Sequence, residues 1–105
     1  MTDIFMVNAQ TVEKLNFTLS RELDLLAAEA LKSDLLKLLH ADGDLLVDGS
    51  EVERVSTPCI EVLVAAAAAF GAGGRSFKIS EPSPPLCESF GAVGLADRIE
   101  LWRAS

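Results

Sequence analysis

The stretch that most constrains this chain is residues 45–70, in which a short apolar segment leads through a polar turn into a long apolar segment. Residues 45–48 read Leu-Leu-Val-Asp, without the alternation of a half-exposed strand, which is typical of a strand covered on both faces in a parallel sheet. Residues 57–70 include an alanine run, and alanine has the highest helix propensity. A buried strand followed by such a helix predicts a βαβ unit and hence an α/β fold.

The rest of the chain continues this alternation. Residues 25–40 carry leucines and alanines at helical spacing, with charged residues opposite, and end at Ala41-Asp42-Gly43. They predict an amphipathic helix. The remaining expected elements are a strand or strand pair within residues 11–20, a strand at 76–79, a short helix at 85–90 and a terminal strand at 98–102.

Length and charge restrict the classes of function. A chain of 105 residues, half of them hydrophobic, predicts one domain over residues 1–105. With 16 acidic and 9 basic residues the net charge is −7, which disfavours binding to nucleic acid or anionic lipid surfaces. The N-terminal residues do not read as a secretory signal, and no apolar run is long enough to span a bilayer. We expect a cytoplasmic protein without direct membrane insertion.

Residue types that bind metals or carry catalysis do not form a recognisable set. His40 is the only histidine, and it shows no metal-ligand spacing with Cys59 or Cys87. One histidine without an ordered serine and acid does not make a catalytic triad. We expect no cofactor, no metal site and no enzymatic activity.

Ser56 and Thr57 place two hydroxyls at the start of the helix predicted for residues 57–70. A hydroxyl there either caps the helix or serves as a phosphate acceptor that a partner reads. If Thr57 is the cap, Pro58 occupies the first helical position, which tolerates its missing N–H. A phosphate on Thr57 would add roughly −1.5 to −2 charges at the positive helix end. Both interpretations stay open, with Ser56 as the second candidate acceptor.

The outer face predicted for this helix is almost uncharged. If Ile60, Leu63 and Phe70 face the sheet, the outward side consists of small and apolar residues with one acid, whereas a helix over a small sheet normally has a polar outer face. This pattern predicts a docking surface or a contact in a weak homodimer. The expected partner-binding residues are Asp24, Pro58, Cys59, Glu61, Val62 and Ala65. Cys59 has two interpretations, as a reactive thiol or as a small buried residue.

In their order and spacing, these segments resemble the STAS family, named for sulfate transporters and anti-sigma factor antagonists. The resemblance covers the chain from about Leu15 to Trp102 and implies a mixed sheet of four to five strands with helices packed mainly on one face. It is carried by residues 19–24 (Leu-Ser-Arg-Glu-Leu-Asp), 46–52 (Leu-Val-Asp-Gly-Ser-Glu-Val), 55–60 (Val-Ser-Thr-Pro-Cys-Ile), 81–83 (Glu-Pro-Ser) and 90–95 (Phe-Gly-Ala-Val-Gly-Leu).

The turn departs from the family pattern at the usual phosphoacceptor. Anti-sigma factor antagonists commonly read Asp-Ser-Ser-Gly-Leu there, and the second serine, which accepts the phosphoryl group, corresponds to Pro58. Thr57 takes the place of the first serine, as a threonine does in the lipid-transport subunits of the family. Residues 59–63 are also similar to stand-alone STAS proteins encoded with bacterial chemotaxis genes.

The resemblance implies an adaptor that binds a histidine-kinase-type ATPase domain in bacterial chemotaxis or anti-sigma-type regulation. The alternative is an accessory subunit bound to the ATPase of an ABC-type lipid transporter.

Overall fold

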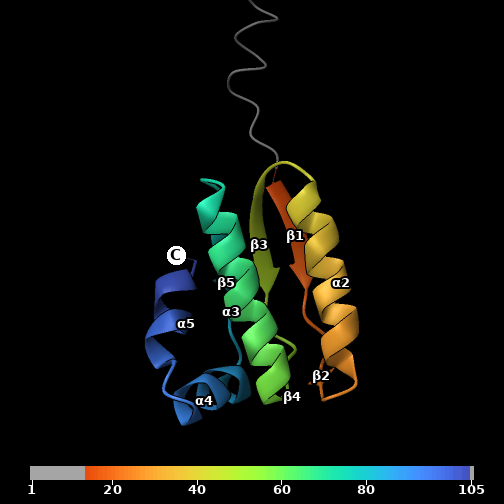
Figure 1. The fold of residues 1–105 in the computed structure, drawn as a ribbon. Coiled ribbons are helices and arrows are strands. Elements are labelled where there is room, and N and C mark those ends of the chain that lie inside the picture. The colour runs from red at the N-terminus through yellow and green to blue at the C-terminus, as the bar shows by residue number, and fades with distance from the viewer. Residues whose placement is uncertain (1–13, 105) are drawn as a thin grey trace, which may run out of the picture.

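A three-stranded parallel sheet forms the centre of the computed structural model, which describes residues 14–104. Its strands, β1 (Lys14–Thr18), β3 (Asp44–Asp48) and β5 (Phe77–Ser80), lie in the order β1-β3-β5. The connections run through α2 (Ala27–His40) and α3 (Thr57–Ala72), which lie side by side on one face of the sheet (Figure 1). The predicted α/β fold with helices mainly on one face is confirmed.

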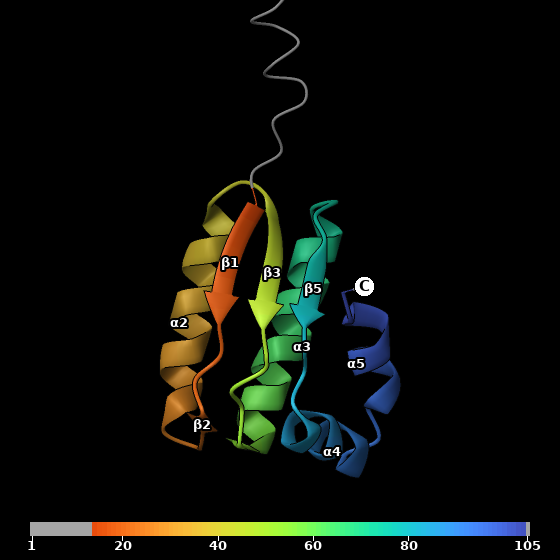
Figure 2. The same cartoon turned by 180° about the vertical axis from the view of Figure 1, so that it is seen from behind.

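The core lies between the sheet and these two helices. Because side chains alternate along a strand, Leu45, Val47, Phe77 and Ile79 point to the helix side and are buried there. The helices contribute Leu31, Leu35, Ile60, Leu63 and Phe70 to the same cluster. The other face of the sheet carries none of the helices in residues 14–104 (Figure 2).

The strands are divided differently from the prediction. Five strands are present in residues 14–104, but β2 (Glu22–Leu23) and β4 (Arg54–Val55) form a separate two-stranded sheet. The central sheet therefore has three strands, fewer than expected, and all its pairings are parallel. Strands of two residues are too short to produce an alternating pattern, so the sequence did not predict β2 and β4.

The C-terminal part was predicted wrongly. Residues 98–102, expected as a strand, belong to the helix α5 (Ala96–Trp102), which follows α4 (Pro84–Ala92) along the edge of the sheet next to β5 (Figure 1). Ile99 and Trp102, three positions apart, are buried, whereas Leu101 is 68% exposed, which fits a helical period instead of an alternating one. The Trp102 ring packs edge-on against Phe77 and Phe90, at centroid distances of 5.2 and 5.7 Å.

The other predicted elements agree with the structure to within two residues at each end. The strand expected within residues 11–20 contains β1, and residues 11–13 lie outside the described part of the chain. The helix α3 continues to Ala72, and the chain then reverses through Gly74, whose φ of 74° suits glycine. No helix in residues 14–104 has both the length and the apolar character needed to cross a bilayer.

Candidate docking site

The small sheet fixes the start of α3 beside the loop that precedes α2. The Arg21 carbonyl accepts hydrogen bonds from the Glu53 and Arg54 amides at 2.8 and 3.2 Å, and the Ser56 amide donates to the Leu23 carbonyl at 2.7 Å. Two exposed ion pairs, Arg21 with Glu53 and Arg54 with Glu22, accompany these bonds. Exposed pairs contribute little energy, so the backbone bonds do most to hold the two loops together.

The turn places Ser56, not Thr57, at the N-cap of α3. Ser56 has extended backbone angles, and its carbonyl accepts the first helical hydrogen bond from the Ile60 amide at 3.1 Å. Thr57 is therefore the first helical residue and Pro58 the second, so the interpretation of Thr57 as the cap is wrong by one position. Proline remains tolerated there because the first N–H groups of a helix have no partner within it.

The two hydroxyls of the turn differ in access. The Ser56 Oγ atom is buried and has no hydrogen-bond partner among residues 14–104, and it makes no capping bond. The Thr57 side chain is exposed. Of the two candidate acceptors, Thr57 is the exposed residue and Ser56 has a buried hydroxyl.

Cys59 and Asp24 meet at the same end of α3. The Cys59 thiol is completely buried and donates to the Asp24 carbonyl oxygen at 3.4 Å. Asp24 itself is exposed, and its carboxylate accepts from the Ala27 amide at 3.0 Å at the start of α2. Cys59 thus has the placement of a small buried residue and lies beneath the surface, whereas Asp24 lies on it.

The facing sides of α2 and α3 border an open groove of about 510 Å³. The α3 side holds Pro58, Glu61, Val62, Ala65, Ala66 and Ala69, which includes the outward face predicted for this helix. The α2 side adds Ala28, Glu29, Lys32, Leu35, Leu36 and Leu39, and Phe70 completes the lining. Four of the predicted partner-binding residues, Pro58, Glu61, Val62 and Ala65, therefore lie together on one wall.

The α2 side of this groove was not predicted from the sequence. Leu36 is exposed there, and Leu25 and Leu26 are exposed just before α2, with Leu26 at 89%. All three lie outside the apolar stripe of the helix, and leucines off that stripe were the available signal. The pairing of the two helix faces depends on tertiary packing, which the separate helix patterns do not encode.

Asp48 shapes the turn that leads from β3 to the small sheet. Its carboxylate accepts a hydrogen bond from the Ser50 amide at 2.9 Å. This bond lowers the pKa of Asp48, and a hydrogen bond with the Ser50 side chain lowers it further by a smaller amount. The next residue, Gly49, packs so closely that an added Cβ would lie 2.9 Å from Leu86 Cδ2. Asp48 therefore orders the turn and does not line the groove.

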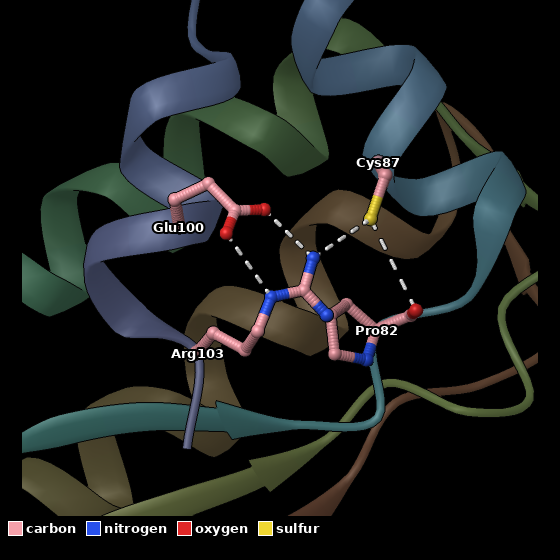
Figure 3. Close-up of polar contacts among 4 residues, drawn as sticks. All are labelled: Pro82, Cys87, Glu100 and Arg103. Atoms are coloured by element: carbon pink, nitrogen blue, oxygen red, sulfur yellow. Dashed lines mark hydrogen bonds and ion pairs between the residues drawn. The ribbon is translucent and has the colours of Figure 1, made fainter. Parts of the chain in front are cut away.

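A second polar cluster joins α4, α5 and Arg103, the residue after α5 (Figure 3), and none of its members lines the groove. Arg103 donates to Glu100 at 2.8 Å and to the Cys87 sulfur at 3.8 Å. The Arg103 hydrogen bond lowers the pKa of Glu100, and the same bond raises that of Arg103. Within residues 14–104, no three or more histidine, cysteine, aspartate or glutamate side chains are grouped so as to hold a metal ion.

Comparison with known proteins identifies one family. A protein-family model described as "Mlab, STAS domain" matches residues 6–102. The match includes the turn, both helices of the groove and the two C-terminal helices. A search of curated proteins finds no match to the chain.

Proposed function

Because this chain belongs to the STAS domain family, we propose that it is a non-enzymatic signalling adaptor that binds a histidine-kinase-type ATPase domain. The pathway is bacterial chemotaxis or anti-sigma-type regulation. The partner occupies the groove between α2 and α3 and contacts the turn around Thr57. The observation that carries the proposal is an apolar groove on the outer side of a helix layer, where a polar surface is the norm.

The dimensions of the groove suit a partner helix. From Pro58 to Ala69 its α3 wall extends over roughly 16 Å, about three helical turns. The small side chains of Ala65, Ala66 and Ala69 let another backbone approach closely, and an amphipathic helix binds such a groove through its apolar face. Burial of apolar area at Val62 and Leu36 then provides most of the affinity.

The charges at the groove set the orientation of that helix. Glu29 and Glu61 lie toward the N-terminal ends of α2 and α3, and Lys32 lies one turn further along α2. A partner helix with a basic residue near the two glutamates and an acidic residue near Lys32 is favoured over the reverse orientation. Asp24 adds a further acidic group at the same end.

A second candidate is an accessory subunit bound to the ATPase of a lipid transporter. It is favoured by Thr57, because the lipid-transport subunits of the family also carry a threonine there, and by the Mlab description of the matching family model. Both candidates use the same groove, so they differ only in the ATPase that occupies it.

Co-purification from the native cells distinguishes the two candidates. Tagged wild type is compared with Ala65→Glu in the groove and with Ala68→Glu, a matched change at an exposed position of α3 outside the groove lining. A histidine kinase retained by wild type and Ala68→Glu but lost with Ala65→Glu supports the first candidate. An ABC-type ATPase with the same pattern supports the second. A partner retained equally by wild type, Ala65→Glu and Ala68→Glu contradicts binding in the groove.

Thr57 allows the docking to be switched by phosphorylation. A phosphate there would place a strongly hydrated negative charge beside Glu61 within the contact surface, so covering it with a partner costs desolvation, while the helix N-terminus stabilises it in the free protein. Since Thr57 is an exposed residue in the first turn of α3, its substitutions should leave the free energy of unfolding nearly unchanged.

Isothermal calorimetry with the co-purified partner tests this switch. We expect Thr57→Asp to weaken binding, and Thr57→Ser and Thr57→Ala to match wild type. Equal affinity of wild type and Thr57→Asp would leave the adaptor constitutive. That result would not affect the proposal for the groove, which depends on Ala65→Glu.

A further inference from the structure

The charged residues of the groove between α2 and α3 lie at one of its ends. Glu29, Lys32 and Glu61 belong to the first halves of the two helices, whereas the second halves line the groove with uncharged side chains only. This apolar half of the groove includes Leu36, Leu39, Ala65, Ala66, Ala69 and Phe70. It favours a ligand that brings apolar side chains and no charge.

The chain itself contains a segment of that chemistry. Residues 4–12 read Ile-Phe-Met-Val-Asn-Ala-Gln-Thr-Val and carry no charge, and the first four of them form an apolar run. The run precedes β1 and lies outside the described residues 14–104. Because it has no charge to desolvate, its entry into an apolar groove is favourable.

The topology brings this segment to the correct end of the groove. The C-terminal ends of α2 and α3 lie at the same end of the molecule as Lys14, the first residue of β1 (Figure 1). A helix with its side chains is about 10 to 12 Å across, which is the thickness that the chain must pass to leave the sheet and reach the outer side of the helices. The six residues 8–13 extend over roughly 20 Å at most. Val7 can therefore reach the apolar half of the groove.

The length of the run also fits. From Val62 to Phe70 the α3 wall is about 12 Å long, and four extended residues span at most about 14 Å. The small side chains of Ala65, Ala66 and Ala69 leave room for a large one such as that of Phe5.

The groove suits this run better than the uncovered face of the sheet does. On that face Asn16 and Lys78 flank Leu46 in the strand register, and Lys14 pairs with Asp44 two residues earlier. An apolar run laid there would cover charged and polar groups, which costs desolvation, whereas the apolar half of the groove offers leucine, alanine and phenylalanine side chains.

We propose that residues 4–7 bind in the apolar half of the groove and compete with the partner ATPase. This inference rests on the proposed function, in which the partner uses the same groove, and adds its regulation. A tether of six residues holds the run at an effective concentration of the order of millimolar, so even a weak contact is populated. The partner has to displace the run, which lowers its apparent affinity.

NMR of the isotope-labelled full chain tests the contact without a partner. In Phe5→Ser/Val7→Ser we expect amide shifts that differ from wild type in the second halves of α2 and α3, far from the substitutions in the sequence. Asn8→Ser, a polar change beside the run, should alter shifts only near position 8. A synthetic peptide of residues 1–13, added to the double variant at millimolar concentration, should restore the wild-type shifts in α2 and α3.

Calorimetry with the purified partner ATPase tests the competition. Phe5→Ser/Val7→Ser should bind roughly tenfold more tightly than wild type, which corresponds to a groove that is free in about one wild-type molecule in ten. Phe5→Leu/Val7→Leu keeps the run apolar and should bind as wild type does.

Four results would overturn the inference. Shift differences confined to the neighbourhood of the substitutions would show that the run does not bind in the groove, and differences confined to β1, β3 and β5 would place it on the sheet. Wild-type shifts in the groove that approach those of the double variant on dilution would assign the run to a second copy of the chain. Equal partner affinities of wild type and the double variant would exclude competition.

These results are separate from the test of the proposed function. That function fails if Ala65→Glu retains the partner, whatever the substitutions at Phe5 and Val7 do. If Ala65→Glu loses the partner and the double variant matches wild type in shifts and affinity, the groove binds the partner and only the competition is wrong.

Discussion

Ser83 is the one polar residue among the nearly inaccessible side chains of residues 14–104, with 7% of its surface exposed. Its hydroxyl donates to the Val52 carbonyl at 2.6 Å and accepts from the Leu86 amide at 3.2 Å, which caps α4. One side chain thus ties the loop before β4 to the start of α4. We expect Ser83→Ala to lower the free energy of unfolding by about 2 kcal/mol, because a cap and a buried hydrogen bond are lost together.

Chemical denaturation measures this loss, with Ser33→Ala as the control. Ser33 lies on the exposed side of α2, and alanine is the better helix former there. If Ser83→Ala changed the free energy of unfolding as little as Ser33→Ala does, water would have replaced the two hydrogen bonds.

The lowered pKa of Asp48 makes the free energy of unfolding depend on pH. Its pKa is lower in the folded state than in the unfolded chain, so its contribution is present above the ordinary aspartate pKa and is lost as the pH falls through the lowered value. Asp48→Asn should therefore destabilise the protein near neutral pH, and this difference should shrink in acid. Urea unfolding of both proteins across the acid range measures it.

Ser50→Ala is the matched variant for Asp48. It removes the smaller, side-chain cause of the shift but keeps the backbone amide that lowers the pKa most. It should retain most of the pH dependence of wild type. If the difference in free energy of unfolding between wild type and Asp48→Asn were the same at all pH values, this explanation would be contradicted.

At the scale of elements, Arg75 links the ends of the two long helices. Its guanidinium donates to the carbonyls of Leu38, Leu39, Ala41 and Gly43 at the C-terminus of α2, with distances of 2.6 to 3.1 Å. It also lies 4.4 Å from the centre of the Phe70 ring. The carbonyls that a helix end leaves without partners are thus satisfied from a different part of the chain.

Lysine cannot replace this arrangement, because an ammonium lacks the planar fork of a guanidinium. We expect Arg75→Lys to lower the free energy of unfolding by about 2 to 3 kcal/mol, as bonds to a charged donor are lost. Arg98→Lys, at an exposed position of α5, should change it little. Thermal and urea unfolding provide the measurement, and equal stability of the two variants would mean that Arg75 does not hold the helix end.

Whether an element could be predicted from the sequence depended on its length and on its pattern of apolar residues. The helix α2 was predicted from its regular apolar stripe, and α3 from its length and its alanine run. The strand β3 was predicted as covered on both faces, and this was wrong: Leu46 is 37% exposed on the face that carries none of the helices in residues 14–104. The short α5 was predicted as a strand because five residues fit either period. The outer wall of α3 was predicted correctly, but its opposing wall on α2 was not, since Leu36 looks like an isolated exposed leucine until the helices are packed.

At the scale of the whole molecule, one layer of helices on a small parallel sheet leaves two surfaces of different chemistry. The helix side has an apolar groove between α2 and α3, next to the exposed hydroxyl of Thr57. On the sheet side, Lys14 and Lys78 share the face around Leu46 with Asp44 and Asp48. A domain with this construction holds its partners by surface burial and charge and is suited to an adaptor in the STAS family.

In the proposed function, the groove between α2 and α3 binds the partner ATPase. Calorimetry of wild type, Ala65→Glu and Ala68→Glu against that purified ATPase tests it most directly. All three should have similar melting temperatures, because both alanines are exposed. Ala65→Glu should bind roughly a hundredfold more weakly, since it leaves a charge buried in an apolar contact, and Ala68→Glu should bind as wild type does. Equal affinities of the two variants would contradict the account.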